Sequence, residues 1–123
     1  MSLITHILFI IRQRLRGNRI SLSTYIKGHH HFKLGQGCKV HADASIDVSR
    51  SLGVTFGNSV TINRYAYVQG STGGVRLGNR VEVNNFSIIN GPGGVDTDDQ
   101  TLIGPGVRII SYQHRYARNS PIY

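Results

Sequence analysis

The sequence has one cysteine, no tryptophan and only three prolines among its 123 residues. Cys38 therefore has no disulfide partner within the chain and cannot build a cysteine-based zinc site, so the fold must be stable without either support. This composition suits a reducing compartment, and the cytoplasm is the expected location. Charged residues make up only 16% of the chain, but a hydrophobic fraction of 39% excludes a wholly disordered polypeptide.

Acidic residues are also scarce. Fourteen Lys and Arg against six Asp and Glu give a formal net charge of +8 at pH 7. This balance favours anionic partners such as nucleic acid, phospholipid headgroups or a phosphorylated cofactor. Basic and aromatic residues are mixed at Arg64, Tyr65 and Tyr67 and again at Arg115 and Tyr116. No docking motif for nucleic acid accompanies them, so we do not expect a nucleic-acid partner.

The apolar run at the N-terminus is too short to cross a bilayer by itself. Residues 3–11 supply about half of the roughly 20 residues that a spanning helix needs. The positive charges follow this run, whereas those of a secretory signal would precede it. Helical spacing predicts a short amphipathic basic helix over about residues 2–16, within an N-terminal segment 1–28. Its apolar face comprises Leu3, Ile4, Ile7, Leu8, Ile11 and Leu15.

This helix has two interpretations. It is either a cap that packs on the main domain or a basic helix that rests on an anionic membrane surface through residues 1–19. The second interpretation places the chain at the inner face of the membrane.

Three adjacent histidines, His29 to His31, precede the main repeat. Successive side chains of a strand point to opposite faces, so three neighbours cannot all face one metal ion. We expect these histidines to face solvent and predict no metal site.

From Leu34 onward the chain repeats every six residues. The first position of each hexad is apolar with one exception, Thr97; these positions are Leu34, Val40, Ile46, Phe56, Ile62, Val68, Leu77, Val83, Ile89, Thr97, Ile103 and Ile109. The fifth position of the first two hexads in each group is small or β-branched, and it is occupied by Cys38, Ala44, Val60, Ala66, Val81, Ser87, Thr101 and Val107. Neither a helix nor an alternating strand has this period.

The spacing of the hexads predicts a β-solenoid. Leu34, Phe56, Leu77 and Thr97 are separated by 22, 21 and 20 residues, which is three hexads plus a short Gly- and Ser-rich insertion. Three hexads make one triangular turn with three short strands, and about four coils are countable within a domain at 29–123. The first and fifth residues face a narrow interior, so Cys38 is interpreted as a small buried hydrophobe and not as a nucleophile.

Residues 34–123 resemble the hexapeptide-repeat acyltransferases, which are left-handed parallel β-helices. The segment TLIGPGVRIISYQH is similar to the active-site coil of the maltose and galactoside O-acetyltransferases and of relatives that modify bacterial surface polysaccharides. The resemblance implies the left-handed winding, acetyl-CoA as acyl donor, a saccharide hydroxyl as acceptor, no metal, and a homotrimer with active sites between subunits.

Matching the motif assigns the catalytic base to His114, whose imidazole can accept the hydroxyl proton near neutral pH. Tyr112 and Arg115, beside the histidine, are further expected substrate contacts, and Arg115 could meet an anionic cofactor or an acidic sugar. The pair Asn84 and Asn85 in the segment VNNF resembles the acceptor-side asparagine pattern of the family. The pattern departs from the family at Phe86, where a second asparagine is expected. An alternative for the two asparagines is a corner position with left-handed backbone angles.

The family carries further coils after the histidine, and these hold most of the acetyl-CoA contacts. The present sequence stops at Tyr123, so we expect a truncated chain with no cofactor-binding residues of its own to name. The alternative function is an inactive remnant, or a non-catalytic basic solenoid that binds an anionic glycan or a membrane surface.

Overall fold

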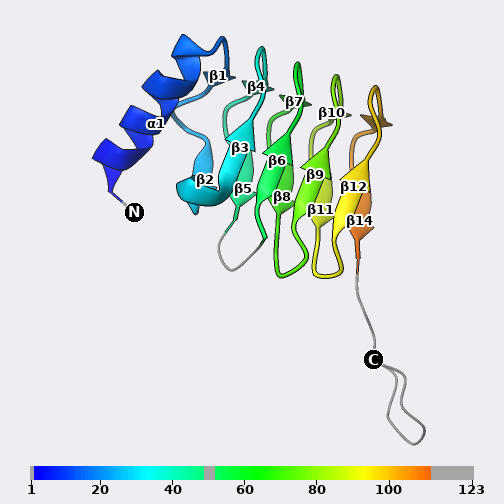
Figure 1. The fold of residues 1–123 in the computed structure, drawn as a ribbon. Helices are drawn as coiled ribbons and strands as arrows, with labels where there is room; N and C mark the ends of the chain where they lie inside the picture. The colour runs from blue at the N-terminus through cyan, green and yellow to red at the C-terminus, as the bar shows by residue number, and fades with distance from the viewer. Residues whose placement is uncertain (1, 49–51, 112–123) are drawn as a thin grey trace, which may run out of the picture.

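A computed structural model describes residues 2–48 and 52–111, which form one helix followed by a triangular column of short parallel strands (Figure 1). Three sheets make the walls of the column. Sheet A has the order β1 (Arg19–Ile20), β4 (Lys39–Val40), β7 (Thr61–Ile62), β10 (Glu82–Val83) and β13 (Leu102–Ile103). Sheet B has the order β2 (Tyr25–Lys27), β5 (Ser45–Asp47), β8 (Tyr67–Gln69), β11 (Ile88–Asn90) and β14 (Arg108–Ile110). Sheet C has the order β3 (Phe32–Leu34), β6 (Val54–Phe56), β9 (Val75–Leu77) and β12 (Val95–Thr97).

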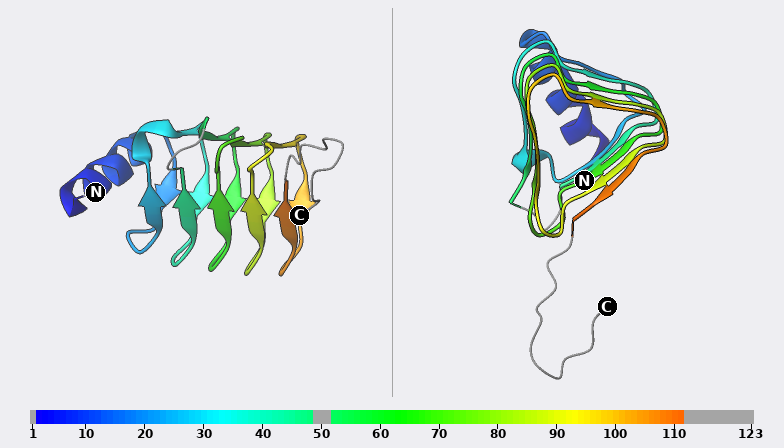
Figure 2. Two further views of the ribbon diagram at one scale, coloured as in Figure 1. Left: turned by 90° about the horizontal axis from the view of Figure 1, so that it is seen from below. Right: turned by 90° about the vertical axis from the view of Figure 1, so that its right-hand side faces the viewer.

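Each strand pairs in parallel with the strand one coil away, and the end-on view in Figure 2 shows the three walls superposed from coil to coil. The predicted fold class, a left-handed parallel β-helix of about four triangular coils after a short helix, is confirmed. Because the coils stack in register, every residue at one position of the repeat lies directly above its counterpart in the next coil.

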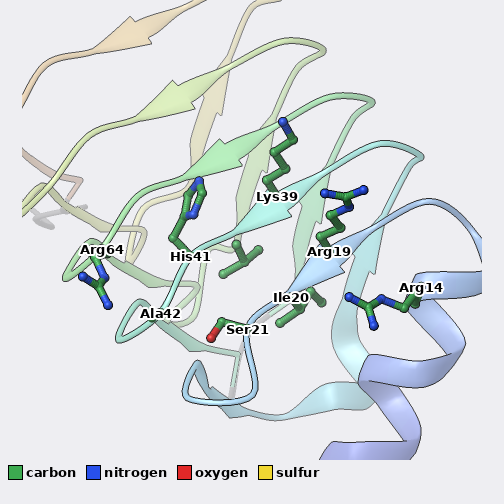
Figure 3. A pocket seen from close by; sticks show the side chains of 9 residues that line it. Arg14, Arg19, Ile20, Ser21, Lys39, His41, Ala42 and Arg64 are labelled. Atoms are coloured by element: carbon green, nitrogen blue, oxygen red, sulfur yellow. The ribbon is translucent and has the colours of Figure 1, made fainter.

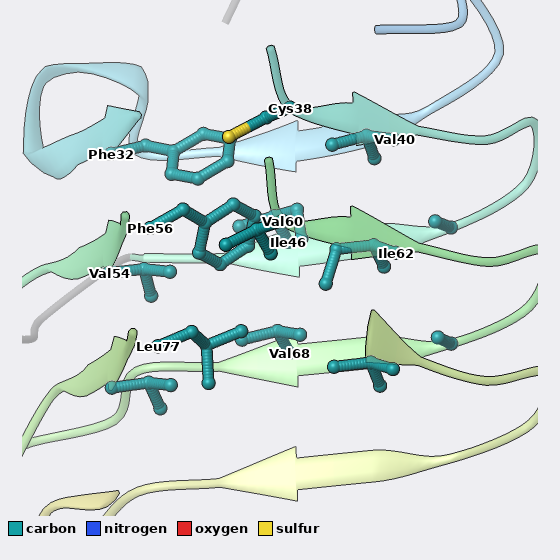
Figure 4. Packing of buried hydrophobic residues seen from close by; sticks show 14 of the residues in the cluster. Phe32, Cys38, Val40, Ile46, Val54, Phe56, Val60, Ile62, Val68 and Leu77 are labelled. Carbon is teal, nitrogen blue, oxygen red and sulfur yellow. The ribbon is translucent and has the colours of Figure 1, made fainter. Parts of the chain in front are cut away.

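The core is a column of first-position and fifth-position side chains. Buried first positions are Leu34, Val40, Ile46, Phe56, Ile62, Val68, Leu77, Val83, Ile89 and Ile103. Buried fifth positions are Cys38, Ala44, Val60, Ala66, Val81 and Ser87. Figure 4 shows several of these side chains, among them Cys38, Ile46 and Phe56, inside the column. Thr97, Thr101 and Ile109 are only half-buried and Val107 is exposed, since all four lie in the last described coil.

A third inward position exists in sheet C. Phe32, Val54 and Val75 lie two residues before the first position of their hexads and are buried. The rings of Phe32 and Phe56 meet edge to face with centroids 5.0 Å apart. Side chains alternate between the two faces of a strand, so the first and third residues of these three-residue strands both point inward. The core is therefore wider at this wall.

The helix α1 (Leu3–Leu15) caps the column. The side chain of Ser2 accepts a hydrogen bond from the backbone N–H of Thr5 and begins the helix. Phe9 and Ile10 pack against the core, and Gln13 is buried. The cap interpretation is therefore correct, but the face that docks is not the predicted one.

The predicted apolar face of the helix points to solvent. Leu3, Ile4, Leu8, Ile11 and Leu15 are all exposed. The helical pattern did not predict the docked face, because the helix carries apolar residues on two sides. The narrower side, with Phe9 and Ile10, contacts the column.

The column begins at β1, earlier in the chain than Leu34, where the predicted hexad repeat starts. Strands β1 and β2 lie within residues 1–28, which the sequence analysis assigned to helix and connector, and they pair with β4 and β5. The signal was present, since Ile20 and Ile26 are six residues apart and the buried Thr24 holds the fifth position. In the described ranges no helix is long and apolar enough to cross a membrane.

The segment His29–His31 is a single 3₁₀ turn and not a strand. His29 is buried against the helix, whereas His30 and His31 are exposed. The expectation that all three face solvent is therefore wrong for His29.

Candidate functional site

The proposed base His114 and its neighbours Tyr112 and Arg115 lie outside the described residues. The coil that leads to them is described up to Ser111, three residues before His114. The backbone N–H of Ser111 donates to the Asn90 carbonyl (3.0 Å), and its carbonyl accepts from the N–H of Gly93 (3.0 Å). The segment IGPGVRII is thus a regular rung, with β13 and β14 paired to β10 and β11.

Asn84 belongs to a ladder of asparagines on the corner between sheets A and B. Its Nδ2 donates to the carbonyl of Ile103 (3.0 Å), and its Oδ1 accepts from Nδ2 of Asn63 in the preceding coil (3.0 Å). Both ends of the Asn84 amide are therefore occupied by neighbouring coils. This arrangement gives Asn84 a structural role in holding three coils together.

Asn85 follows at the same corner and remains half-buried. Its carbonyl accepts the N–H of Gly106 (2.9 Å). Neither asparagine takes left-handed backbone angles; the residue that does so is Phe86, with φ of 64°. The alternative role proposed for the asparagines as left-handed corner residues is therefore wrong.

Phe86 forms an exposed aromatic stack that sequence reasoning missed. Tyr65 holds the equivalent position one coil earlier, also with positive φ (62°). The two rings are nearly parallel (7°), with centroids 5.2 Å apart, and the residues are 52% and 64% exposed. A bulky residue with positive φ is unusual, and here both aromatic side chains stand outward as one flat apolar surface beside Asn85.

The corner with Asn84, Asn85 and Phe86 and the last described residue, Ser111, lie on opposite sides of sheet B. The three corner residues precede β11, whereas Ser111 directly follows β14. These are opposite edges of sheet B, because β11 and β14 run in parallel.

A basic groove runs along the outer face of sheet A at the helix end of the column. Its volume is about 510 Å³, and it is lined by the basic side chains of Arg14 of α1, Arg19 of β1, Lys39 of β4 and Arg64, together with His41. Figure 3 shows these side chains projecting from successive coils and from the helix. The basic composition predicted an affinity for anions but not the position of this groove, because its residues are distant in sequence.

The buried side chain of His29 forms a hydrogen bond with His6 of α1. Its Nε2 lies 3.1 Å from Nδ1 of His6, and Nε2 of His6 lies 3.2 Å from the carbonyl oxygen of Leu22. Since the carbonyl can only accept, neutral His6 carries its proton on Nε2, and Nε2–H of His29 donates to His6. Nδ1 of His29 is then an unprotonated, buried atom with no hydrogen-bond partner. Burial, followed by the charges of His6 and His30, lowers the pKa of His29.

Cys38 is a fully buried free thiol. Its Sγ lies 3.2 Å from the Gly57 carbonyl, to which it donates a weak hydrogen bond. Burial raises the pKa of this thiol, which disfavours the thiolate and a nucleophilic role.

Over the described residues, no group of three or more His, Cys, Asp or Glu side chains is placed to hold a metal ion. Comparison of the chain with protein-family models, with curated proteins and with solved structures gave no significant match. The assignment of a function therefore depends on the fold and on the geometry of the site.

Proposed function

We propose that the protein is a coenzyme A-dependent O-acetyltransferase that acetylates a saccharide hydroxyl, with surface polysaccharide as the acceptor class. The observation that carries the proposal is the regular rung formed by IGPGVRII in a left-handed parallel β-helix, followed at once in the sequence by SYQH. This combination of fold and motif is the one that the resemblance to hexapeptide-repeat acyltransferases implies.

In the proposed reaction His114 is the general base. Its neutral imidazole takes the proton of the acceptor hydroxyl while the oxygen forms a bond to the thioester carbonyl carbon of acetyl-CoA. The tetrahedral oxyanion collapses with cleavage of the C–S bond, and the coenzyme A thiolate takes the proton from the imidazolium. No covalent enzyme intermediate and no metal take part. Holding both substrates in one groove supplies much of the rate enhancement.

The acceptor surface of the proposal is the corner with Asn85 and the Tyr65–Phe86 stack. Exposed aromatic faces provide rigid apolar area, which suits the apolar face of a sugar ring, and Asn85 and Arg64 beside them supply polar contacts. A homotrimer is part of the proposal, because the family that the chain resembles places each active site between neighbouring subunits. Tyr112 and Arg115 remain proposed substrate contacts.

Activity of the 123-residue chain with acetyl-CoA and saccharide acceptors tests this proposal. Released coenzyme A is measured with a thiol reagent, and the buried Cys38 contributes little background. We expect His114→Ala to lower kcat about 10²- to 10⁴-fold, the range for loss of a general base. His30→Ala, which removes an exposed imidazole, is the matched control and should leave turnover unchanged. Equal turnover of the His114→Ala variant and the unaltered chain would refute the proposed role.

The basic groove favours a second candidate function, that of a non-catalytic solenoid that binds an anionic surface. This candidate predicts that the unaltered chain binds no acetyl-CoA in equilibrium dialysis and transfers no acetyl group. The acetyltransferase proposal predicts the opposite result in both measurements.

A further inference from the structure

Positive charge is concentrated at the helix end of the column. The first 42 residues contain seven Lys and Arg and no Asp or Glu, a net charge of +7, whereas the other 81 contain seven basic and six acidic residues, a net charge of +1. Because the coils are stacked in sequence order, the charges of the described residues are divided in the same way along the axis of the column.

The outer face of sheet A differs from the other two walls in how its charges are placed. Arg19 and Lys39 are register partners on adjacent strands. In sheet B the partner of Lys27 is an acid, Asp47, and in sheet C the partner of Arg76 is Asp96. Like charges directly opposite each other on neighbouring strands are destabilising. Sheet A therefore carries a repulsion that the other walls avoid.

No described acidic side chain relieves this repulsion. Arg14 extends from the helix into the same groove, and none of Arg14, Arg19 and Lys39 forms an ion pair within residues 2–48 and 52–111. Glu82, the acid of this wall, lies two strands beyond Lys39 and accepts a hydrogen bond from Asn63. The groove thus offers several unpaired cations to an external anion.

An apolar surface adjoins this groove on the helix. The exposed residues at Leu3, Ile4, Leu8, Ile11 and Leu15 cover an arc of about 140° at about 3.6 residues per turn. Ile4 is 70% and Leu15 84% exposed. The same helical geometry places Arg14 on the edge of this arc, so the apolar face and the basic groove share a border.

Leu22 and Tyr25 extend the apolar surface beyond the helix. They are 62% and 56% exposed and line the same hollow as Leu3 and His6. An apolar helix face bordered by basic residues and a basic groove is the arrangement of an interfacial membrane helix. Its apolar residues enter the boundary between headgroups and acyl chains, and its cations meet the anionic headgroups.

A second copy of the chain is a poorer occupant for this surface. A twofold contact uses the same patch of both copies, and this patch contains no Asp or Glu. Arg12, Arg14 and Arg16 are all exposed on the helix, and the same face of a second copy would offer them no acidic side chain. An anionic bilayer neutralises the same residues.

We propose that α1 and the first two coils form a docking surface for an anionic phospholipid bilayer, in which the exposed apolar helix face enters the interface and Arg14, Arg19 and Lys39 contact lipid phosphates. This proposal does not rest on acetyltransferase activity. Adjacent strands are about 4.8 Å apart, so Arg64 on the third coil lies about 10 Å from the first strand of sheet A. This is about one Debye length in physiological salt, and its contribution should be smaller than that of Arg19.

Flotation of the full 123-residue chain with liposomes tests the proposal. The chain should float with vesicles of phosphatidylcholine containing 30% phosphatidylglycerol, should float weakly with pure phosphatidylcholine, and should be released by high salt. We expect the triple variant Arg14→Gln, Arg19→Gln and Lys39→Gln to lose about 100-fold in partitioning, at roughly fivefold for each cation. The matched control is Arg76→Gln, Arg80→Gln and Arg108→Gln, which removes three exposed charges beyond the first two coils and should lose less than tenfold.

A double variant tests how much the exposed apolar face of the helix contributes to liposome binding. Leu8→Ser with Ile11→Ser alters only exposed helix residues and should reduce partitioning at least tenfold while the circular dichroism spectrum and melting temperature stay unchanged. Equal flotation of both basic triple variants, or unchanged flotation of the serine variant, would overturn the proposal.

Sedimentation of the free chain tests the alternative that a second copy of the chain, and not a bilayer, covers the helix face. If the chain is an oligomer that the serine variant converts to a monomer, and neither form floats with anionic vesicles, the helix face is an interface between copies and the proposal is wrong. His114→Ala should float like the unaltered chain, so a failure of the acetyltransferase assay leaves the lipid result interpretable.

Discussion

Side chains at the corners of the column decide how closely its coils approach. Gly57 follows β6 at the corner between sheets C and A, where Asn58 N–H donates to Oδ1 of Asn79 in the next coil (2.8 Å). The same bond recurs from Asn79 to Asp99 (2.7 Å). A Cβ on Gly57 would lie 2.5 Å from Oδ1 of Asn79 and 2.9 Å from its backbone nitrogen, so glycine is required by contact with the adjacent coil.

We predict that Gly57→Ala lowers the free energy of unfolding by about 2–3 kcal/mol, because overpacking forces the neighbouring backbone to move. Gly104→Ala is the control, since its nearest contact would be an ordinary 4.0 Å from Val107. Urea denaturation of both variants checks the prediction. A similar midpoint for the two would mean that the corner tolerates a wider spacing of coils.

Residue-scale features of the core were predictable and those of the corners were not. A narrow triangular interior requires small fifth-position residues, and this identified the burial of Cys38 and Ala44 correctly. The pairing of Tyr65 with Phe86 depends on the turn in which each ring leaves the column. A pattern of inward residues carries no information about that turn.

At the scale of elements, α1 is attached to the column by a polar pair as well as by apolar packing. His29 contacts His6 through the hydrogen bond described above, and its ring meets Phe9 edge to face with centroids 4.9 Å apart. Protonation would place a second N–H at the buried Nδ1 of His29, which has no acceptor. The neutral imidazole is therefore the form that fits the docked helix.

This arrangement predicts a pH dependence of stability. The pKa of His29 is lowered from its ordinary value of 6.5 in the folded state, so the unfolded chain binds more protons than the folded one below that pH. Stability should be complete above about pH 7 and should fall as the pH decreases through 6.5 toward the lowered pKa. Melting temperatures at pH 7.5 and 5.5 measure this effect.

His29→Leu should reduce the difference between the two pH values, even if it shifts both melting temperatures. His30→Ala, an exposed neighbour, should retain the difference. An equal pH response of His29→Leu and the unaltered chain would assign the effect to other groups.

The periodicity of the sequence predicted the bounds of the helix but not the face that contacts the column. Its bounds were close to those observed, because Ser2 and Gly17 limit it from both sides. Its docked face was not predictable from hydrophobicity alone. The sequence is apolar on two sides, and the choice between them depends on Phe9, Gln13 and the aromatic residues of the first coil.

At the scale of the whole molecule, stability is a sum of contacts between neighbouring coils. Val60, Val68 and Val81 in the middle coils are fully buried, and their strands have partners on both sides. The described strands β12, β13 and β14 each pair on one side. Local openings should therefore be rarest in the middle of the column.

We predict that amide hydrogen exchange is slowest in β7, β8 and β10 and at least tenfold faster in β13 and β14. Mass spectrometry of peptic fragments measures the gradient. Phe9→Ala, which loosens the cap, should accelerate exchange in β2 and β3 more than in β8. Uniform exchange along the column would indicate a single cooperative unit instead of a stack of coupled coils.

The repeat period was enough to predict the column, because register follows from the spacing of hexads. It was not enough to predict the candidate sites. The basic groove joins residues from the helix and three coils, and the aromatic stack joins the corners of two coils. Such juxtapositions depend on how the walls are placed around the axis.

The docking of α1 also affects how copies of the column could associate end to end. Strands exposed at both ends of a solenoid would let copies add head to tail without limit, as open heterologous contacts do. With α1 seated over the first coil, the strand edges at this end of the column are obstructed. Phe9 and Ile10, which hold the helix in place, thereby hinder the addition of a second copy at the first coil.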